Sequence, residues 1–386
     1  MNEFDRELAQ RLAALREQGL FRELRCIHSP QSPRIEFEGR TLLNFSSNDY
    51  LGLANEPALK EAAIKAVGQF GAGAGASRLI CGTLPPHREL DEKIAAFKGT
   101  AAALSFSTGY AAAIGAIGAL AGQDDVIVID KLVHACIVDA ARLCGAKLRV
   151  FDHNDLTDLE RILKWAEAKV RSPKARTLIV TESVFSMDGD HAPLREIVEL
   201  KEKYGAWLMV DEAHATGLYG AQRRGLAEEL GVSDRIEIQM GTLGKALGAA
   251  GGYVCGSRAL VDYLINRART LIFSTAPVPA AAAAATAGIR FVQSRAGEAR
   301  RSLLWQRVSD LPSTLRSAII PMLIGAEAKA VEAATALRAQ GIFIPAIRYP
   351  TVARGQARLR LTVTAAHTHA DMVQLLAALK PLDFGL

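Results

Sequence analysis

Short apolar runs alternate with longer amphipathic stretches along most of this chain of 386 residues. Leucines at three- and four-residue spacing predict a helix over residues 1 to about 20, and residues 56–68 are expected to form another. A hairpin is expected between these helices, and the glycine-rich segment 71–77 ends the second one. Later apolar runs are short and rich in β-branched residues, as in strands buried on both faces; they cover residues 102–106, 126–130, 148–151, 177–182, 207–211, 236–240 and 252–255. Because these runs alternate with helices, the pattern predicts an α/β fold with a mainly parallel central sheet.

The composition changes near residue 276, where proline and alanine dominate before a long helical stretch. Three strand-like runs follow, separated by helical sequence: SAIIPMLIG, IFIPAIRYP and ARLRLTVT. We therefore expect a small N-terminal segment of helix and hairpin over residues 1–55, a large α/β domain over 56–294, and a small C-terminal α+β domain over 295–386.

Charge is nearly balanced, with 46 basic and 41 acidic residues spread along the chain. This distribution lacks the basic arm that binds nucleic acid, so we expect no nucleic-acid partner. Residues 99–123 are uncharged and long enough to cross a membrane, but they are mostly alanine and glycine, which favours a buried helix and no membrane span. Five cysteines without a C-x-x-C pair, and an N-terminus without an apolar leader, favour reduced thiols and a cytoplasmic location.

Polar residues follow several of the predicted strands. Asp211 and His214 follow one strand, and Lys245 follows the next within the run GTLGKALG. His134 comes after residues 126–130, and Ser107-Thr108-Gly109-Tyr110 comes after residues 102–106. Because the working groups of an open parallel sheet lie at the carboxyl ends of its strands, we expect these residues to meet at one edge.

These residue types fit pyridoxal 5'-phosphate (PLP) better than a nucleotide or a metal. Neither G-x-x-x-x-G-K-[ST] nor G-x-G-x-x-G occurs, and Asp211 with His214 lacks an obvious third metal ligand. Lys245 lies among small and apolar residues, which favours the neutral amine that a Schiff base needs. Ser107–Gly109 at a helix start could hold a phosphate, and Asp211 could hold a pyridinium proton. His134 is then free to stack on the ring, although a histidine on a helix surface would give the same pattern.

The order of Ser-Thr-Gly-Tyr, His134, TESVFSMDGD, VDEAH and GTLGKALG resembles the α-oxoamine synthases. These are fold-type I PLP enzymes with an aspartate aminotransferase-like fold, and the resemblance covers nearly the whole chain. Four longer segments are most similar to the biotin-pathway branch of that family: NFSSNDYLGL (44–53), FDHNDLTDLE (151–160), LIFSTAPVPAAAAAA (271–285) and PTVARGQARLRLTVTAAHT (350–368).

The resemblance implies a role for each matching residue around the ring. Lys245 would form the Schiff base with PLP and later move protons at the substrate Cα. Asp211 would pair with the pyridine nitrogen, His214 would bind the phenolic oxygen, and His134 would stack on the ring.

The resemblance also implies how the phosphate and the substrates are held. Gly109 and Tyr110 would cradle the phosphate with Ser186 and Thr242 nearby, and Thr275 would reach it from a neighbouring subunit, so a homodimer with a shared active site is expected. Substrate contacts fall on residues that include Arg360, whose planar fork suits the amino-acid carboxylate; they are Arg22, Asn48, His134, Thr351 and Arg360. Two departures from the family are mild: Ser183 stands where glycine is common, and Tyr110 where phenylalanine is common.

The implied reaction is a decarboxylative condensation of L-alanine with a pimeloyl thioester, carried on CoA or on an acyl carrier protein. A glycine C-acetyltransferase and a 5-aminolevulinate synthase share Asp211, His214 and Lys245, so they stay open as alternatives. An aminotransferase is disfavoured because that group usually stacks an aromatic ring where His134 stands. A non-catalytic partner subunit would be expected to lack Lys245.

Overall fold

The computed structural model describes residues 1–169 and 175–382 of the chain. These residues form two compact units. The larger unit comprises Asn48–Ser186 and Asp190–Ser302, and the smaller unit comprises Met1–Ser47, Met187–Gly189 and Leu303–Leu386. The N-terminal segment therefore belongs to the same unit as the C-terminal part of the chain.

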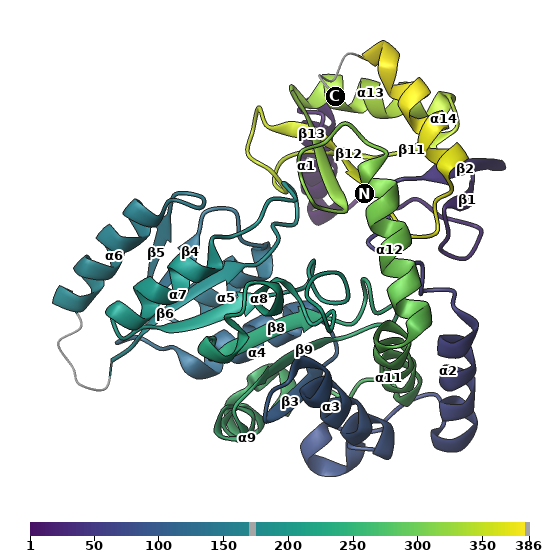
Figure 1. Ribbon diagram of the computed structural model, residues 1–386. Helices are drawn as coiled ribbons and strands as arrows, with labels where there is room; N and C mark the ends of the chain where they lie inside the picture. Colours follow the sequence, from purple (N-terminus) through teal and green to yellow (C-terminus); the bar gives the residue numbers. More distant parts are fainter. Residues whose placement is uncertain (170–174, 383–386) are drawn as a thin grey trace. The chain divides into compact units, whose positions relative to one another are not determined.

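A seven-stranded sheet is the centre of the larger unit (Figure 1). Its strands, in spatial order, are β3 (Ala102–Phe106), β9 (Gly252–Gly256), β8 (Ile238–Thr242), β7 (Trp207–Asp211), β6 (Thr177–Glu182), β4 (Val126–Asp130) and β5 (Lys147–Phe151). All pairs from β8 to β5 are parallel, whereas β9 runs antiparallel to both β3 and β8. The predicted mainly parallel sheet is thus confirmed.

The predicted strands agree with the observed ones to within one residue, apart from a shift of two residues at β8. Strands β3 and β4 are buried along their whole length, and β6 to β9 are buried at every residue but one, which explains their continuous apolar character. The predicted run 236–240 starts early, because pairing with β9 begins at Ile238 and extends to Thr242. Thr242 is therefore the last residue of β8 rather than part of the following turn.

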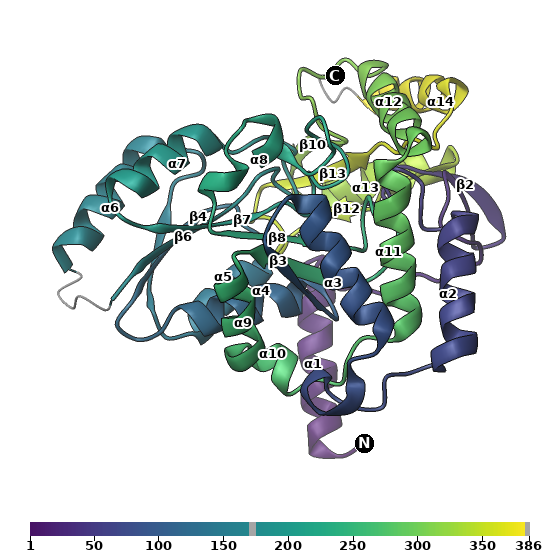
Figure 2. The ribbon, with the colours of Figure 1, turned by 60° about the horizontal axis from the view of Figure 1, so that its bottom comes forward.

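Helices cover both faces of this sheet. Figure 2 shows α4 (Gly109–Leu120) and α5 (Ala135–Leu143) on one face, with α6 (Leu156–Lys169) and α7 (Leu194–Lys203) on the other. Beside the sheet, α11 (Pro279–Gln293) packs against α2 (Pro57–Phe70) and α3 (Pro85–Lys98). The other helices of the larger unit are the π-helix Arg78–Gly82, α8 (Leu226–Glu229), the 3-10 helix Ser233–Arg235, α9 (Arg258–Arg267) and α10 (Arg269–Ile272). The chain passes from the larger unit to the smaller one within α12 (Arg295–Ser309).

The smaller unit contains two three-stranded sheets. The predicted hairpin is confirmed as β1 (Arg34–Phe37) and β2 (Arg40–Asn44), and β11 (Ile342–Phe343) joins β2 in parallel. The second sheet has the order β10 (Ile319–Gly325), β13 (Ala357–Thr362), β12 (Ala346–Ile347). The run IFIPAIRYP, expected as one strand, is divided between β11 and β12 of the two sheets.

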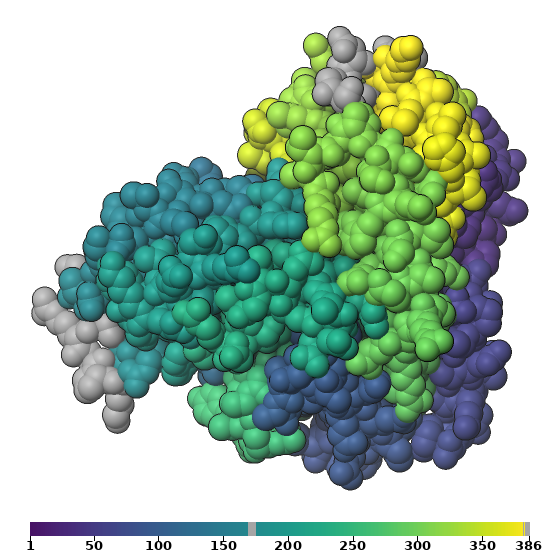
Figure 3. All heavy atoms as spheres, in the orientation of Figure 1, coloured from purple at the N-terminus to yellow at the C-terminus, as the bar shows by residue number. Residues whose placement is uncertain are grey.

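Helices complete the smaller unit: α1 (Glu3–Glu17), α13 (Glu327–Ala339), α14 (His369–Leu379) and the 3-10 helix Lys380–Leu382. In Figure 3 the yellow residues of α14 form part of its surface. The predicted N-terminal helix is confirmed, but none of its residues is buried in the single chain. Leu8, Leu12 and Leu15 of α1 are each about 40% exposed. Their apolar face is therefore only partly covered by the chain itself.

The uncharged residues 99–123 form β3, a turn and α4. Five residues of α4 are fully buried, as expected for an alanine-rich helix against the sheet. No helix within residues 1–169 and 175–382 is long and apolar enough to span a bilayer.

Candidate active site

Three neighbouring strands end at the same edge of the larger sheet and bring acidic residues together. Asp211 is the last residue of β7, and it stands in register with Glu182, the last residue of β6, and with Met240 of β8. Asp211 is 5% exposed and Glu182 is 2% exposed. The Oδ1 atom of Asp211 accepts a 2.8 Å hydrogen bond from the backbone of Ala213, which fixes the turn that leads to His214.

Lys245, His214 and Tyr50 form a chain of polar contacts. The Nζ atom of Lys245 lies 2.7 Å from Nε2 of His214, and the Tyr50 hydroxyl lies 2.6 Å from Nδ1 of the same ring. The Tyr50 hydroxyl also lies 3.3 Å from Oδ1 of Asn48, to which it can donate when Nδ1 of His214 carries the ring proton. The structure thus joins two predicted cofactor residues with Asn48, and adds Tyr50, which the sequence analysis did not single out.

The protonation of Lys245 is coupled to Tyr50 through the His214 ring. If Tyr50 donates to Nδ1, the ring proton is on Nε2, and only a neutral Lys245 amine can accept it. If Nδ1 carries the proton, Tyr50 accepts it and Nε2 can accept from a charged ammonium. The hydrogen bond of the Tyr50 hydroxyl therefore influences whether the Lys245 amine is neutral, as a Schiff base requires, or charged.

Glu182 is a second residue that the sequence analysis left out of the site. Its Oε1 accepts a 2.5 Å hydrogen bond from the backbone of His134, and its Oε2 accepts one of 3.1 Å from the backbone of Ser186. Burial, together with the neighbouring Asp211 charge, raises the pKa of Glu182 to about 8. Burial also raises the pKa of Asp211, although the Lys245 ammonium opposes this shift.

His134 is the N-cap residue of α5 and lies just before the first residue of that helix. Its Nδ1 accepts a 3.2 Å hydrogen bond from the backbone of Cys136, which orients the ring at the helix start. The side chain is exposed, so the ring face is accessible. His134 is therefore not an ordinary residue on a helix surface. It caps α5, and its backbone amide is bound by Glu182 at the end of β6.

The residues predicted to form a phosphate cup lie at the start of α4. Thr108 caps this helix by accepting a 2.9 Å hydrogen bond from Ala111, and Gly109 is its first residue. A Cβ atom on Gly252 of β9 would lie 2.5 Å from both the Gly109 Cα and the Thr108 carbonyl oxygen. Backbone therefore approaches backbone here, and the first-turn N–H groups of α4 offer an anion site.

Two further phosphate candidates lie beside this cup. A Cβ atom on Gly109 would be 3.7 Å from the Thr242 Cβ, so Thr242 borders the helix start. Tyr110 is 46% exposed and donates to Asp139 at 2.5 Å. Thr275 belongs to the same unit but is exposed, and it bridges to Ser77.

The other substrate candidates lie in the smaller unit. Arg360 of β13 is 7% exposed and donates to the Thr362 hydroxyl at 3.0 Å. Arg22 donates to the Tyr349 carbonyl at 3.1 Å, two residues before Thr351. Within this unit, Arg22 therefore lies near the segment that carries Thr351.

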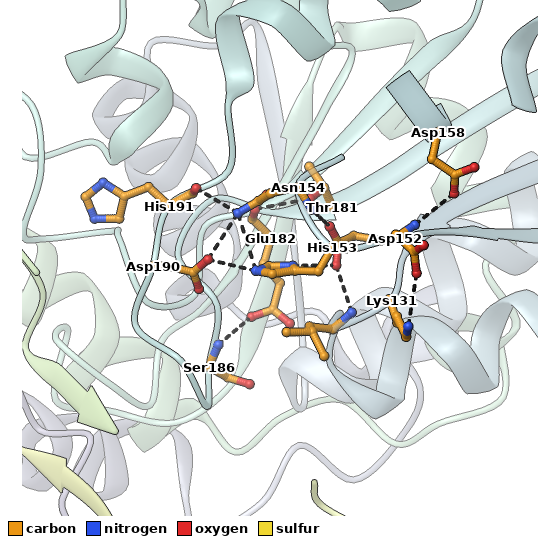
Figure 4. A network of polar contacts seen from close by, with 12 residues as sticks. Lys131, Asp152, His153, Asn154, Asp158, Thr181, Glu182, Ser186, Asp190 and His191 are labelled. Atoms are coloured by element: carbon orange, nitrogen blue, oxygen red, sulfur yellow. Dashed lines mark hydrogen bonds and ion pairs between the residues drawn. The ribbon is translucent and has the colours of Figure 1, made fainter. Parts of the chain in front are cut away.

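A charged network surrounds His153, at the ends of β4 and β5 (Figure 4). Its Nδ1 lies 2.9 Å from Asp130 and its Nε2 lies 2.7 Å from Asp190. Asn154 binds the same two carboxylates. Burial lowers the pKa of His153, but the hydrogen bonds to Asp130 and Asp190 outweigh it and raise the pKa to about 10. The segment FDHND is the one signal of this network in the sequence.

These residues fit PLP. The larger unit offers a lysine amine, an acid at a strand end, and a helix start against which the backbone of Gly252 packs closely. Two buried carboxyl groups with raised pKa values lie on adjacent strands, so a cationic ring beside them would be favourable.

Comparison with known proteins agrees with this geometry. The family described as aminotransferase class I and II matches residues 40–379. The 8-amino-7-oxononanoate synthase of Geotalea daltonii is 47% identical over 96% of each chain, and that of Herminiimonas arsenicoxydans is 46% identical over 97% of this chain and 98% of its own.

Solved structures show the same fold. A serine palmitoyltransferase of Sphingomonas wittichii matches with a TM-score of 0.88 and 32% identity, over 100% of this chain and 98% of its own. One from S. paucimobilis, solved with bound PLP and myriocin, gives 0.90 and 29% over 99% of both chains. The 8-amino-7-oxononanoate synthase of Francisella tularensis gives 0.74 and 27% over 89% of this chain and 98% of its own. The predicted fold type, enzyme class and PLP cofactor are thus confirmed, and the chain belongs to the aminotransferase class I and II family and, within it, to the PLP-dependent α-oxoamine synthases.

Proposed function

We propose that this chain condenses L-alanine with a pimeloyl thioester, giving 8-amino-7-oxononanoate, CO₂ and a free thiol, as a cytoplasmic enzyme of biotin biosynthesis. Relatives named for this product match the chain at 46–49% identity over nearly its full length. The observation that carries the proposal is the contact of Lys245 with His214, beside the buried carboxyl group of Asp211.

PLP, when bound, accepts the electron pair left at the substrate Cα. Lys245 binds the cofactor, takes the Cα proton of alanine, and later returns a proton to the product. Its amine must be neutral for this step, and the His214–Tyr50 chain can hold it so. Asp211 would hold the proton on the ring nitrogen: burial raises the pKa of this acid in the chain alone, and the ring cation would oppose that shift and favour the carboxylate. His214 would bind the phenolic oxygen, and His134 would stack on the ring.

We assign the binding of the PLP phosphate to Gly109, Tyr110, Ser186 and Thr242. The N–H groups in the first turn of α4, which begins at Gly109, support this assignment. Ser186 lies close to the site because its amide binds Glu182. On resemblance alone, Arg360 is assigned to the alanine carboxylate, and Arg22, Asn48 and Thr351 to further substrate contacts.

We also propose a homodimer in which Thr275 reaches the phosphate of the partner subunit. The partly exposed leucines of α1 support a second chain, because an amphipathic helix with no fully buried residue gains little by folding alone. Mixing Lys245→Ala and Thr275→Ala chains should restore part of the activity, since one of the two sites in a mixed dimer is then intact. Absence of any rescue would argue against a shared site.

The proposed reaction is tested by thiol release from pimeloyl-CoA, acetyl-CoA and succinyl-CoA, each with alanine, glycine and serine. The expected best pair is pimeloyl-CoA with alanine, and a clear preference for acetyl-CoA with glycine would overturn the assignment.

Lys245→Ala should abolish turnover and the borohydride-fixable yellow cofactor. Lys65→Ala, at an exposed position of α2, is the matched control and should leave both unchanged.

A further inference from the structure

A cavity of about 950 Å³ lies in the larger unit, at the edge of the sheet opposite to the candidate active site. Trp207 and Ile238, the first residues of β7 and β8, line this cavity. Asp211 and Thr242, the last residues of the same two strands, lie at the other edge. The cavity is therefore separate from the residues assigned to PLP, and the proposed reaction gives it no role.

Much of the cavity wall is apolar, and part of it is aromatic. Trp207 is joined there by Leu120 at the end of α4, and by Leu260 and Tyr263 of α9. Tyr263 is 47% exposed, so its ring offers surface that a ligand can cover. The volume falls within the range of roughly 300–1,000 Å³ typical of small-molecule sites. Because aromatic rings pack well on one another, this wall suits a ligand that contains a flat ring.

Arg224 places a positive charge on this wall that no carboxylate neutralises. In the described part of the chain, its guanidinium group has neither an ion-pair partner nor a hydrogen-bond acceptor. Lys98, another cation of the wall, is held by Glu212 at 2.7 Å. Gly99 leaves room for the Arg224 guanidinium, because a Cβ atom there would lie 2.5 Å from its Nη1 atom. The planar donor group of Arg224 is thus available to a carboxylate of a ligand.

Gln239 of β8 adds a hydrogen-bond acceptor that lacks a donor. The residue lines the cavity and is only 2% exposed. Its Nε2 atom donates to the Ser233 carbonyl at 3.0 Å, which leaves Oε1 as the second polar atom of the amide. Among the residues that the structure describes, Oε1 has no hydrogen-bond partner. Because a buried acceptor without a donor is costly, a ligand that brings an N–H group to Gln239 gains affinity.

Three carboxylates on the same wall limit the choice of anion. They belong to Glu228, Asp234 and Glu237. Glu237 is paired with Lys201 at 2.6 Å, whereas Glu228 accepts hydrogen bonds from two backbone amides. A phosphate group with two negative charges would be repelled by these acids more strongly than a carboxylate with one. The charges of the wall therefore favour a carboxylate over a phosphate.

We propose that this cavity is a second binding site, for a small carboxylic acid built on a flat ring that carries an N–H group. The carboxylate pairs with Arg224, the ring N–H donates to Oε1 of Gln239, and the ring lies against Trp207 and Tyr263. A purely apolar ligand would leave Arg224 and Gln239 without partners, and a nucleotide would bring its phosphates close to the three carboxylates. This site does not depend on the proposed reaction.

Indole-3-acetate is the probe for this site, because it combines a flat ring, an N–H group and a carboxylate. Calorimetry with the PLP-loaded enzyme should detect its binding, and saturating L-alanine should leave that binding unchanged. Arg224→Met should weaken the binding about tenfold, the loss expected for one charge-assisted contact. The parent should bind 3-methylindole, which lacks the carboxylate, more weakly by a similar factor. Arg142→Met, at an exposed arginine of α5, is the matched control and should bind indole-3-acetate as the parent does.

The N–H contact is tested with 1-methylindole-3-acetate. The parent should bind this analogue about tenfold more weakly than indole-3-acetate, whereas Gln239→Met should bind the two ligands alike. If that variant does not fold, the difference between the two ligands in the parent decides the outcome. The proposal is overturned if indole-3-acetate does not bind, if L-alanine displaces it, if Arg224→Met binds it as tightly as the parent, or if the parent binds both indole acids equally. None of these measurements uses turnover, so they remain informative if the proposed reaction is wrong.

Discussion

The backbone amide of His134 donates a 2.5 Å hydrogen bond to the carboxylate of Glu182. This contact ties the start of α5 to the end of β6, and so fixes the residue assigned to stack on the cofactor ring. Glu182 pairs in register with Asp211, so two buried acids share one edge of the sheet. The geometry explains why the pKa of Glu182 is raised to about 8.

Replacing Glu182 by glutamine should change the pH dependence of apoenzyme stability. A raised pKa means that the folded state favours the protonated acid, so stability from this group is present below its ordinary pKa and is lost as pH rises toward 8. Relative to the parent, Glu182→Gln should therefore gain melting temperature between about pH 5 and pH 8. Glu167→Gln, at an exposed position of α6, should show no such trend. A constant difference between parent and variant across this range would contradict the prediction.

Removing the Tyr50 hydroxyl should impair proton transfer at Lys245. In Tyr50→Phe, Nδ1 of His214 loses its 2.6 Å partner, and the ring no longer favours one tautomer. We expect kcat to fall about tenfold and the pH profile of kcat to shift, with PLP still bound. Tyr204→Phe is the matched control, because it removes a hydroxyl that binds Glu160 on a different part of the unit. An unchanged pH profile in Tyr50→Phe would exclude this role.

A methyl group on Gly252 should weaken cofactor binding. It would enter within 2.5 Å of the Gly109 Cα and the Thr108 carbonyl, and would push the start of α4 away from β9. We expect PLP affinity to fall at least tenfold, measured by cofactor release on dilution. Gly118→Ala is the control within the same helix: its Cβ meets nothing within 4 Å, so it should keep affinity and raise stability by about 0.5–1 kcal/mol. Equal PLP affinity in Gly252→Ala and the parent would count against the α4 helix start as the phosphate site.

Much of the sheet could be predicted because each strand is a local apolar run. Strands β3, β4, β6 and β7 match their predicted bounds, since burial on both faces leaves a continuous signal. At β8 the apolar run begins before the pairing does, because pairing depends on the distant β9. The local apolar pattern thus predicts that a strand is present, whereas its first residue depends on the neighbouring strand with which it pairs.

The site divides in the same way. Asp211, His214 and Lys245 could be placed at one edge of the sheet from the sequence because each lies at or shortly after the carboxyl end of a strand, where parallel sheets place their working groups. Tyr50 could not be predicted, since it lies 164 residues from His214 and its role depends on one side-chain contact. Glu182 is the last residue of a strand as well, but only the register with Asp211 shows that the two acids interact.

His153 gives the last prediction, because it is held between two carboxylates near the Glu182 end of β6. Its pKa is raised to about 10, so stability from the imidazolium is fully present below about pH 6.5 and is lost as pH rises toward 10. His153→Gln should lower the free energy of unfolding at pH 7 by about 2 kcal/mol, since Asp130 and Asp190 lose their shared cation while part of the network stays solvated. The difference should shrink in urea titrations between about pH 7 and pH 10. His28→Gln, at an exposed histidine, supplies the baseline. If the difference between His153→Gln and the parent were the same at both ends of this range, the imidazolium would not be the stabilising form, and the network would owe its stability to neutral hydrogen bonds.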